Sequence, residues 1–247
     1  MLFLDSVHRW EPALGCNFVL SKHQQKQTRN SMKTSSKVAV IGLGNIGKAV
    51  AQILVKGNRP VILASKKLED AEALAEELGS LATASETSEA IKNADILIFS
   101  VWFNTLQELI GQYGEALSGK IIIDTTNPIA PDENGGFKKI IGEKESSGQL
   151  NAEILPSGAK LVKAFGTLGV ASLASAAFQS PEKGVLFYAA DEESVDAEVK
   201  ELIQDAGFEA VKVGGLDQSI RIEVFGDLHE FGALGKVVSK AEAIEKL

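Results

Sequence analysis

Residues 37–67 read KVAVIGLGNIGKAVAQILVKGNRPVILASKK. The stretch opens on an apolar run, passes through the turn GLGNIG, and continues with apolar residues at three- and four-residue spacing. Residues 37–41 therefore predict a buried strand, and residues 45–56 predict an amphipathic helix. A second apolar run at residues 60–64 completes a β-α-β unit of about thirty residues, which is the context in which a G-x-G-x-x-G turn indicates dinucleotide binding.

Each glycine of this turn has its own expected task. Gly42 permits the tight turn, Gly44 lets the backbone approach a pyrophosphate, and Gly47 lets the helix pack closely against the strand. The free N–H groups and the dipole of the helix N-terminus favour phosphate there. We therefore expect a pyrophosphate to be bound by the whole turn, which consists of Gly42, Leu43, Gly44, Asn45, Ile46 and Gly47. The alternative, a tight strand–helix turn without a ligand, is disfavoured by the surrounding β-α-β pattern.

The residues after the second strand select the nucleotide. NAD sites usually carry Asp or Glu about 20 residues beyond the glycines, where the carboxylate binds the ribose hydroxyls. Here Ser65 occupies that place, and Lys66 and Lys67 follow it. A hydroxyl and two ammonium groups can donate to a 2′-phosphate, which a carboxylate would repel. The sequence therefore favours NADP(H) over NAD(H), although the lysines could instead be only a solvated helix start.

Strands and helices alternate through most of the remaining chain. Further strands are expected at residues 81–84, 95–101, 120–124, 161–165, 184–190 and 209–213, and further helices at residues 67–78, 85–92 and 193–206. This alternation predicts an α/β fold with a Rossmann-type parallel sheet covered on both faces. We expect the NADP-binding Rossmann domain to span residues 32–155 and a small α/β domain for substrate and dimerisation to span residues 156–247.

The C-terminal segment predicts one long amphipathic helix from about residue 217. Apolar residues recur at helical spacing along it, namely Val224, Leu228, Phe231, Leu234, Val238, Ala241 and Ile244. Three glycines on the same segment would let a partner helix approach closely, so the segment is expected to pack in a dimer.

Composition excludes several classes of protein. The 247 residues contain a single cysteine, Cys16, and three histidines, and the formal net charge is −8. One cysteine cannot form an intrachain disulfide or a cysteine-rich zinc site, and no metal site is expected. The acidic balance without a basic stripe argues against nucleic-acid binding, and no apolar run reaches the roughly 20 residues that span a bilayer. A cytoplasmic location is expected.

Residues 1–31 differ from the rest of the chain. They show neither helical nor strand periodicity and end in the polar stretch KHQQKQTRNS, after which Met32 opens MKTSSKVAVIG. The segment lacks the basic start of a signal peptide. We expect it to be a disordered extension, or the result of a start codon assigned too far upstream.

Two loops follow buried strands, SVWFN at residues 100–104 and DTTNP at residues 124–128. Open α/β sheets bind ligands at the carboxyl ends of their strands. We therefore expect Val101, Trp102, Asn127 and Pro128 to lie against the cofactor, and Trp102 also to border the acceptor. Phe103 serves equally well as an apolar cap on the next helix.

The tyrosines exclude one class of dehydrogenase. Short-chain dehydrogenases require Tyr-x-x-x-Lys, whereas Tyr113 and Tyr188 are followed four residues later by Leu117 and Glu192. About 80 residues remain after Phe165, and they begin with strand-like sequence. This disfavours the large all-helical domain of 3-hydroxyacid dehydrogenases and pyrroline carboxylate reductases.

Five stretches together resemble the NADPH-dependent coenzyme F420 reductases and their relatives among predicted dinucleotide-binding oxidoreductases. They are VAVIGLGNIGKAVAQIL, LASKK, ADILIFSVWF, VKAFGTL and AGFEAVKVGGLDQSIRIE, and they occur in the order and spacing of that family over residues 37–235. The resemblance implies a homodimeric NADP-dependent oxidoreductase, with a small C-terminal domain closing over the Rossmann domain. It also implies hydride transfer between the nicotinamide and a second carrier stacked on it. Ser65 and Lys66 match the family's 2′-phosphate binders, and residues 42–47 match its pyrophosphate loop.

The chain departs from the family pattern on the acceptor side. Leu43 stands where a threonine is common, Trp102 and Phe103 stand where the family has Pro-Trp, and Gly166 stands where a bulkier residue can face the deazaflavin. The acceptor therefore stays open between an F420-like deazaflavin, a flavin, a quinone and a small carbonyl or imine compound. We expect Trp102, Gly166 and Leu168 to border it.

A proton donor is needed only for some of these acceptors. His229 is the best single candidate for it, because it forms with Glu230 the one histidine–carboxylate pair after residue 31. The alternative is a solvated or interface histidine. The alternative function, from a different class of protein, is that of a non-catalytic NADP(H)-sensing regulatory protein. A deep cleft lined by Trp102, Asn127 and Leu168 would favour the enzyme.

Overall fold

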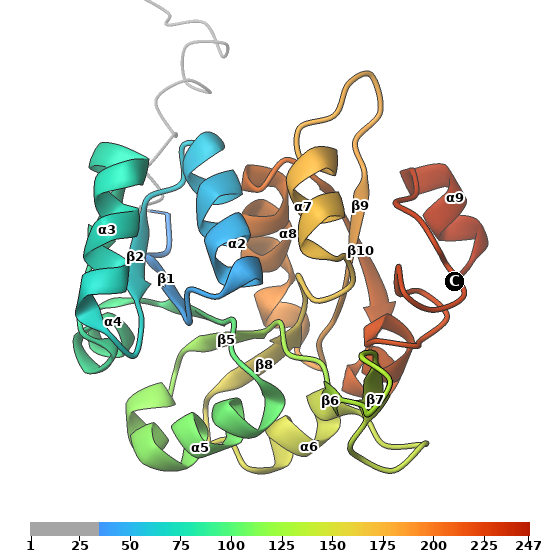
Figure 1. The fold of residues 1–247 in the computed structure, drawn as a ribbon, viewed down its shortest axis with the longest axis horizontal. Coiled ribbons are helices and arrows are strands. Elements are labelled where there is room, and N and C mark those ends of the chain that lie inside the picture. The colour runs from blue at the N-terminus through green and yellow to red at the C-terminus, as the bar shows by residue number, and fades with distance from the viewer. Residues whose placement is uncertain (1–34) are drawn as a thin grey trace, which may run out of the picture. The chain divides into compact units, whose positions relative to one another are not determined.

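The computed structural model describes residues 35–247, and the expectation for residues 1–31 lies outside them. Its centre is an eight-stranded sheet in the order β10-β9-β8-β5-β4-β1-β2-β3 (Figure 1). The strands of this sheet are β1 (Val38–Ile41), β2 (Val61–Ala64), β3 (Ala82–Ala84), β4 (Ile96–Phe99), β5 (Ile121–Asp124), β8 (Lys160–Lys163), β9 (Val185–Ala189) and β10 (Glu209–Gly214). A separate antiparallel hairpin joins β6 (Ile129–Pro131) and β7 (Phe137–Lys139).

Pairing in the sheet confirms the predicted Rossmann-type architecture. β1 pairs in parallel with β2 on one side and with β4 on the other, and the parallel order continues to β3 and to β5 and β8. The chain therefore reverses its direction of winding between β1 and β4, which is the point where open α/β sheets bind ligands. β9 joins β8 in antiparallel orientation, and β10 pairs in parallel with β9.

Helices cover both faces of the sheet, as the continuous apolar strands predict. They are α2 (Asn45–Lys56), α3 (Leu68–Leu78), α4 (Thr87–Asn93), α5 (Phe103–Tyr113), α6 (Ser147–Glu153), α7 (Val170–Ala176), α8 (Asp196–Asp205) and α9 (Lys240–Glu245). Figure 1 shows α2, α3, α7 and α8 on one face and α4, α5 and α6 on the other. None of the helices in residues 35–247 is long and apolar enough to cross a membrane.

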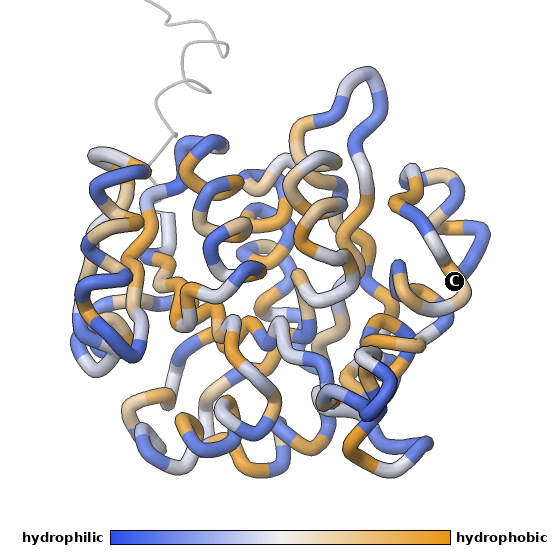
Figure 2. Tube along the Cα trace, viewed as in Figure 1, coloured by the Kyte–Doolittle hydropathy of each residue, from blue (hydrophilic) through white to orange (hydrophobic). Residues whose placement is uncertain are grey.

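Alternation along the strands explains how two cores form from one sheet. In β1, Val38 and Val40 pack with α2, α3, α7 and α8, whereas Ala39 and Ile41 pack with α4 and α5. Successive side chains of a strand point to opposite faces, so a strand buried on both faces must be apolar at every position. Figure 2 shows this as hydrophobic colouring along the central strands and hydrophilic colouring mainly on outer turns.

The predicted long C-terminal helix is wrong. Residues 216–222 form a 3₁₀ segment, tight turns follow, and the only α-helix after residue 216 in the described chain is α9, which has six residues. Gly232 packs so closely on the preceding turn that a Cβ on it would lie 1.8 Å from the carbonyl oxygen of Gly226. Phe225 and Gly235 adopt positive φ angles of 73° and 70°, which no α-helix accommodates. The long helix that was expected to form the dimer contact is therefore not formed.

The apolar residues of that segment cover β9 and β10 instead. Leu228, Leu234 and Val238 are buried against Val185 and Phe187 of β9 and their neighbours, whereas Phe231 stays 62% exposed. The spacing of the apolar residues therefore reflects their burial against the sheet and not the apolar face of a helix. The proposed division of the chain at residue 155 stays a prediction, and strands from both sides of it share the sheet.

Candidate cofactor and acceptor site

The glycine turn joins β1 to α2 at the point where β1 lies beside β4. Gly42 has a φ of +92°, and a Cβ on it would lie 2.4 Å from the carbonyl oxygen of Ser100. Its N–H donates to the carbonyl oxygen of Ala64 at 2.9 Å. Position 42 therefore requires glycine for both its backbone angle and its close approach to the loop after β4.

The other two glycines of the motif have opposite surroundings. A Cβ on Gly47 would lie 1.9 Å from the carbonyl oxygen of Gly42, so Gly47 allows helix and turn to meet. A Cβ on Gly44 would meet no heavy atom within 4 Å. Gly44 precedes α2 as its N-cap residue, with no side chain capping the helix. An open approach to free N–H groups at this end of α2 fits a pyrophosphate.

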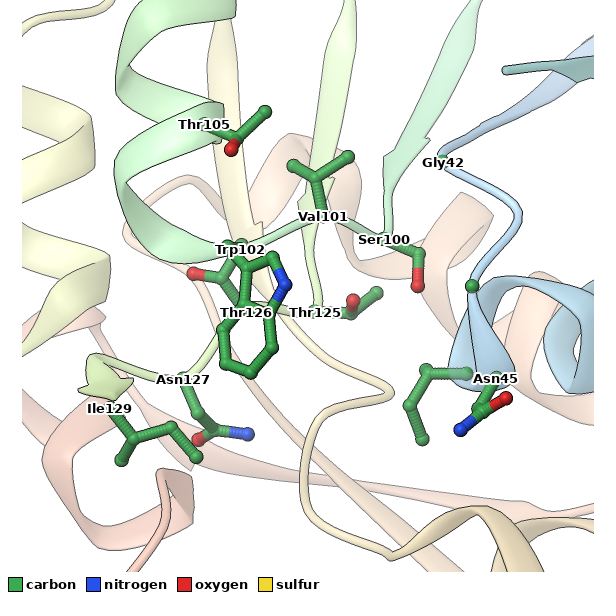
Figure 3. A pocket seen from close by; sticks show the side chains of 12 residues that line it. Gly42, Asn45, Ser100, Val101, Trp102, Thr105, Thr125, Thr126, Asn127 and Ile129 are labelled. Carbon is green, nitrogen blue, oxygen red and sulfur yellow. The ribbon is translucent and has the colours of Figure 1, made fainter. Parts of the chain in front are cut away.

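A cavity of about 460 Å³ lies over this turn and the carboxyl ends of β4 and β5 (Figure 3). Its lining comes from the glycine turn, the loop after β4 with the start of α5, and the loop after β5: Gly42, Gly44, Asn45, Ile46, Ser100, Val101, Trp102, Thr105, Thr125, Thr126, Asn127 and Ile129. We call it the first cavity. In Figure 3 the Trp102 ring projects beside Thr125 and Thr126, and Asn45 lies across from it.

A second cavity, of about 620 Å³, lies on the other side of Gly42. It is lined by Ile41, Gly42, Ser65, Lys66, Glu86, Thr87, Ser88, Val101, Thr105, Glu108, Leu109, Gln112 and Tyr113. Gly42, Val101 and Thr105 line both cavities. The two spaces therefore meet at the glycine turn, as the two halves of a dinucleotide meet at its pyrophosphate.

Two of the three predicted nucleotide-selecting residues lie at the second cavity. Ser65 and Lys66 line it, whereas Lys67 is exposed, precedes α3 as its N-cap residue, and is not part of the lining. The carboxylates of Glu86 and Glu108 belong to the same lining. Lysine and hydroxyl donors at the end of β2 suit a 2′-phosphate, provided that the phosphate lies nearer to Lys66 than to these carboxylates.

Asn127 connects the first cavity to two distant segments. Its side-chain amide donates to the carbonyl oxygen of Gly166 at 3.1 Å, and its carbonyl oxygen accepts from the N–H of Val224 at 2.7 Å. A Cβ on Gly166 would lie 2.7 Å from the carbonyl oxygen of Thr125. Gly166 therefore lies against the wall of the cavity rather than in its lining, and glycine is needed there for close packing.

His229 is buried and both of its ring nitrogens are engaged. Nδ1 accepts from the N–H of Phe231 at 2.9 Å, so Nε2 carries the proton and donates to the carbonyl oxygen of Gly166 at 2.9 Å. Burial lowers the pKa of His229 below its usual range, and the neutral ring is favoured. His229 lines neither cavity. Its contacts support the Gly166 loop and leave no free nitrogen for a substrate.

The remaining predicted residues divide between the cavity and the core. Trp102 lines the first cavity with 57% of its surface exposed, and its ring lies 6.5 Å from that of Phe137 on the β6–β7 hairpin. Leu43 and Leu168 are buried core residues. Pro128 is buried, and its carbonyl oxygen accepts from the N–H of Ile140, so it shapes the loop behind Asn127.

One face of α5 lines the second cavity and was not predicted from the sequence. Thr105, Glu108, Leu109 and Gln112 share one helical face, and all four belong to the lining of the second cavity. Their i, i+3, i+4, i+7 spacing was available as a signal, but polar residues at that spacing ordinarily face solvent. Within residues 35–247, no cluster of three or more His, Cys, Asp or Glu side chains could hold a metal ion.

Known proteins are similar to this chain over residues 37–128 and, in three cases, over most of its length. Residues 37–128 match the family described as NADP oxidoreductase coenzyme F420-dependent. The F420-dependent NADP reductase of Methanothermobacter marburgensis is 25% identical over 198 residues, covering 76% of this chain and 88% of that protein.

Solved structures reproduce the fold. A hypothetical protein from Sinorhizobium meliloti is similar with a TM-score of 0.73 and 25% identity, covering 89% of this chain and 100% of that one. A candidate F420-dependent NADP reductase from an Arthrobacter species has a TM-score of 0.64 at 18% identity, covering 74% of this chain and 87% of that one, and shows the shared fold alone. Residues 37–128 thus match the coenzyme F420-dependent NADP oxidoreductase family, and most of the chain is distantly similar to the Methanothermobacter reductase.

Proposed function

We propose that the chain binds NADPH across the two cavities and transfers its hydride to a planar redox carrier, with an F420-like deazaflavin or a flavin as the preferred acceptor class. The observation that carries the proposal is the meeting of the two cavities at Gly42, beside the open space over Gly44. The adenosine half with its 2′-phosphate would occupy the second cavity, near Ser65 and Lys66. The nicotinamide half would occupy the first.

The lining of the first cavity supports an acceptor that needs no protein acid. Its side chains are apolar, hydroxyl or amide, and none of its twelve lining residues is His, Asp, Glu, Lys, Arg, Tyr or Cys. Reduction of a carbonyl compound is usually assisted by a positioned proton donor. Hydride transfer between two rings depends mainly on their alignment. NADPH supplies the hydride when it is bound, and the protein would supply the alignment.

Trp102 is the residue best placed to align an acceptor. Its ring is more than half exposed, lines the first cavity, and packs at a tilt against Phe137. An exposed aromatic face next to a cofactor cavity offers a stacking surface for a planar ring system. Ile129 extends the apolar wall on the same side. These contacts support a flat aromatic acceptor more than a small aliphatic carbonyl compound.

The test is anaerobic oxidation of NADPH, followed at the nicotinamide absorbance band, with F420, FMN, quinones and a panel of carbonyl and imine compounds. The proposal expects rapid oxidation with F420 or FMN and slow oxidation with the carbonyl panel. Rapid turnover of a carbonyl or imine substrate alone would overturn the acceptor class. Tight NADPH binding without turnover of any acceptor would instead support the regulatory sensor of NADP(H).

A further inference from the structure

A group of buried charges lies behind the first cavity and has no place in the function proposed above. Asp124 at the end of β5, Lys163 at the end of β8 and Glu223 after the 3₁₀ segment are at most 2% exposed. None of the three lines a cavity near the glycine turn. Burial of charged side chains destabilises the fold unless they are paired, so the stability of this arrangement depends on the groups that pair with these three.

Asp124 and Lys163 are partners on neighbouring parallel strands. They stand opposite each other in the register of β5 and β8, and Lys163 Nζ lies 3.1 Å from Asp124 Oδ2. The same ammonium group donates to Ser147 Oγ at 2.7 Å and to the backbone carbonyl oxygen of Thr126. An ammonium group has three protons, and these three partners account for all of them.

Thr126 is held at both of its backbone polar groups by this pair. Its N–H donates to Asp124 Oδ1 at 2.7 Å, and its carbonyl oxygen accepts from Lys163 Nζ. Thr126 lines the first cavity and is buried. The two charges therefore fix the peptide groups on either side of a residue that forms the cavity wall.

Glu223 connects the same pair to the neighbouring residue of the wall. Its carboxylate accepts from Ser147 Oγ at 2.9 Å and from two backbone N–H groups at the start of α6. Because Ser147 Oγ accepts from Lys163 and donates to Glu223, the three charges form one connected network. The next residue, Val224, donates its N–H to the side chain of Asn127.

We propose that Lys163 is a positioning residue, which with Asp124 and Glu223 sets the wall of the nicotinamide half of the site through Thr126 and Asn127. The inference rests on the proposed NADPH site. Lys163 does not touch the cofactor; it acts through the Thr126 carbonyl. Loss of this contact would let the loop after β5 move relative to the nicotinamide while the second cavity, formed by other elements, keeps its shape.

The test compares two ligands that share the adenosine half. NADPH and 2′-phospho-ADP-ribose, which lacks the nicotinamide, are titrated into the whole protein and into Lys163→Met. The expected result is a loss of NADPH affinity of about tenfold, the size of one hydrogen bond to a charged group, with 2′-phospho-ADP-ribose within about twofold of its original affinity. The emission of bound NADPH, which arises from the reduced nicotinamide, should shift towards that of free NADPH.

A second variant distinguishes loss of the Lys163 contact from misfolding caused by an unpaired buried charge. Asp124, Lys163 and Glu223 carry a formal sum of one negative charge, which Lys163→Met makes more negative. The double variant Asp124→Asn with Lys163→Met keeps the native sum and should show the same selective loss. Arg59→Met is the matched control, because Arg59 is also a buried cation held by two carboxylates, yet it contacts α8 and not the cavity wall.

The outcomes separate the inference from the function on which it rests. Parallel changes for the two ligands, or the same selective loss in Arg59→Met, would overturn the positioning role. Unchanged NADPH affinity and emission in both Lys163 variants would also overturn it. If the unmodified protein binds neither ligand, the result contradicts the proposed NADPH-dependent function, and the proposed role of Lys163 is then contradicted as well.

Discussion

Replacing Gly44 by alanine should separate cofactor binding from folding. The added Cβ meets no heavy atom within 4 Å, and the backbone angles of Gly44, φ −70° and ψ −168°, are open to alanine. The substitution therefore needs no rearrangement of the folded chain. It does place a methyl group in the space that a pyrophosphate must approach.

The expected change in stability is small because two effects oppose each other. Alanine restricts the unfolded chain, which stabilises the fold by about 0.4–1 kcal/mol. Alanine is also a poorer N-cap residue than glycine, which destabilises the fold by about 0.5–1 kcal/mol. The sum is about zero, and for a chain of this size the midpoint of thermal unfolding should move by less than about 2 °C.

The expected change in NADPH binding is much larger. Loss of one close hydrogen bond between a backbone N–H and phosphate removes about 1.5–3 kcal/mol, or about a tenfold to hundredfold change in Kd. At a ligand concentration of about 100 times the original Kd, NADPH stabilises the unmodified protein by about 2.7 kcal/mol. A tenfold weaker Kd reduces that stabilisation to about 1.4 kcal/mol, which a thermal shift assay resolves.

Two further glycines provide matched controls. Gly47→Ala brings a Cβ to 1.9 Å from the carbonyl oxygen of Gly42, so it should lower stability by about 1–3 kcal/mol through overpacking. Gly111→Ala lies on an exposed turn of α5 with open space around it, and it should raise stability by up to about 1 kcal/mol without affecting NADPH. A loss of stability in Gly44→Ala as large as that in Gly47→Ala, or NADPH binding as tight as that of the unmodified protein, would refute the role assigned to Gly44.

Three more substitutions test separate parts of the structure. Ser65→Asp should reverse the preference for NADPH over NADH in thermal shift measurements, because a carboxylate repels the 2′-phosphate; an unchanged ratio would move the phosphate site away from Ser65 and Lys66. Gly166→Ala should lower the free energy of unfolding in urea by about 1–3 kcal/mol, since its Cβ would lie 2.7 Å from a carbonyl oxygen of the cavity wall, and equal stability would contradict that close approach. For His229, burial lowers the pKa in the folded state, so the unfolded state binds more protons as the pH falls below about 6.5 and stability decreases. His229→Gln should therefore lose less stability than the unmodified protein between pH 7 and pH 5, and parallel curves would show that His229 titrates normally.

The β-α-β unit could be predicted because all of its determinants are local. The apolar runs, the 3/4 spacing and the glycine turn lie within about thirty residues, and α2 occupies the predicted range, Asn45–Lys56. Each glycine has the backbone angle or the surroundings that its place in the motif requires. The parallel sheet followed for the same reason, since continuous apolar strands alternating with helices have few other ways to bury both faces.

The C-terminal segment shows where local pattern fails. Its apolar residues have helical spacing, yet the backbone contacts made by Gly226 and Gly232 allow tight turns that a sequence pattern does not report. Burial of Leu228 and Leu234 against β9 and β10 outweighs the helical preference of the segment. A helix of this length would also carry three glycines, each of which costs about 1 kcal/mol relative to alanine.

By itself, the sequence determined the Rossmann-type sheet, the glycine turn and the candidate residues for NADP(H) selection, because these depend on neighbours along the chain. Only the tertiary structure decided what lies behind the nicotinamide half of the site. Asp124, Ser147, Lys163 and Glu223 come from four separate segments, up to 99 residues apart along the chain. They meet because the sheet order places β5 next to β8. A buried charge is stable only where such partners converge, and no stretch of sequence contains that information by itself.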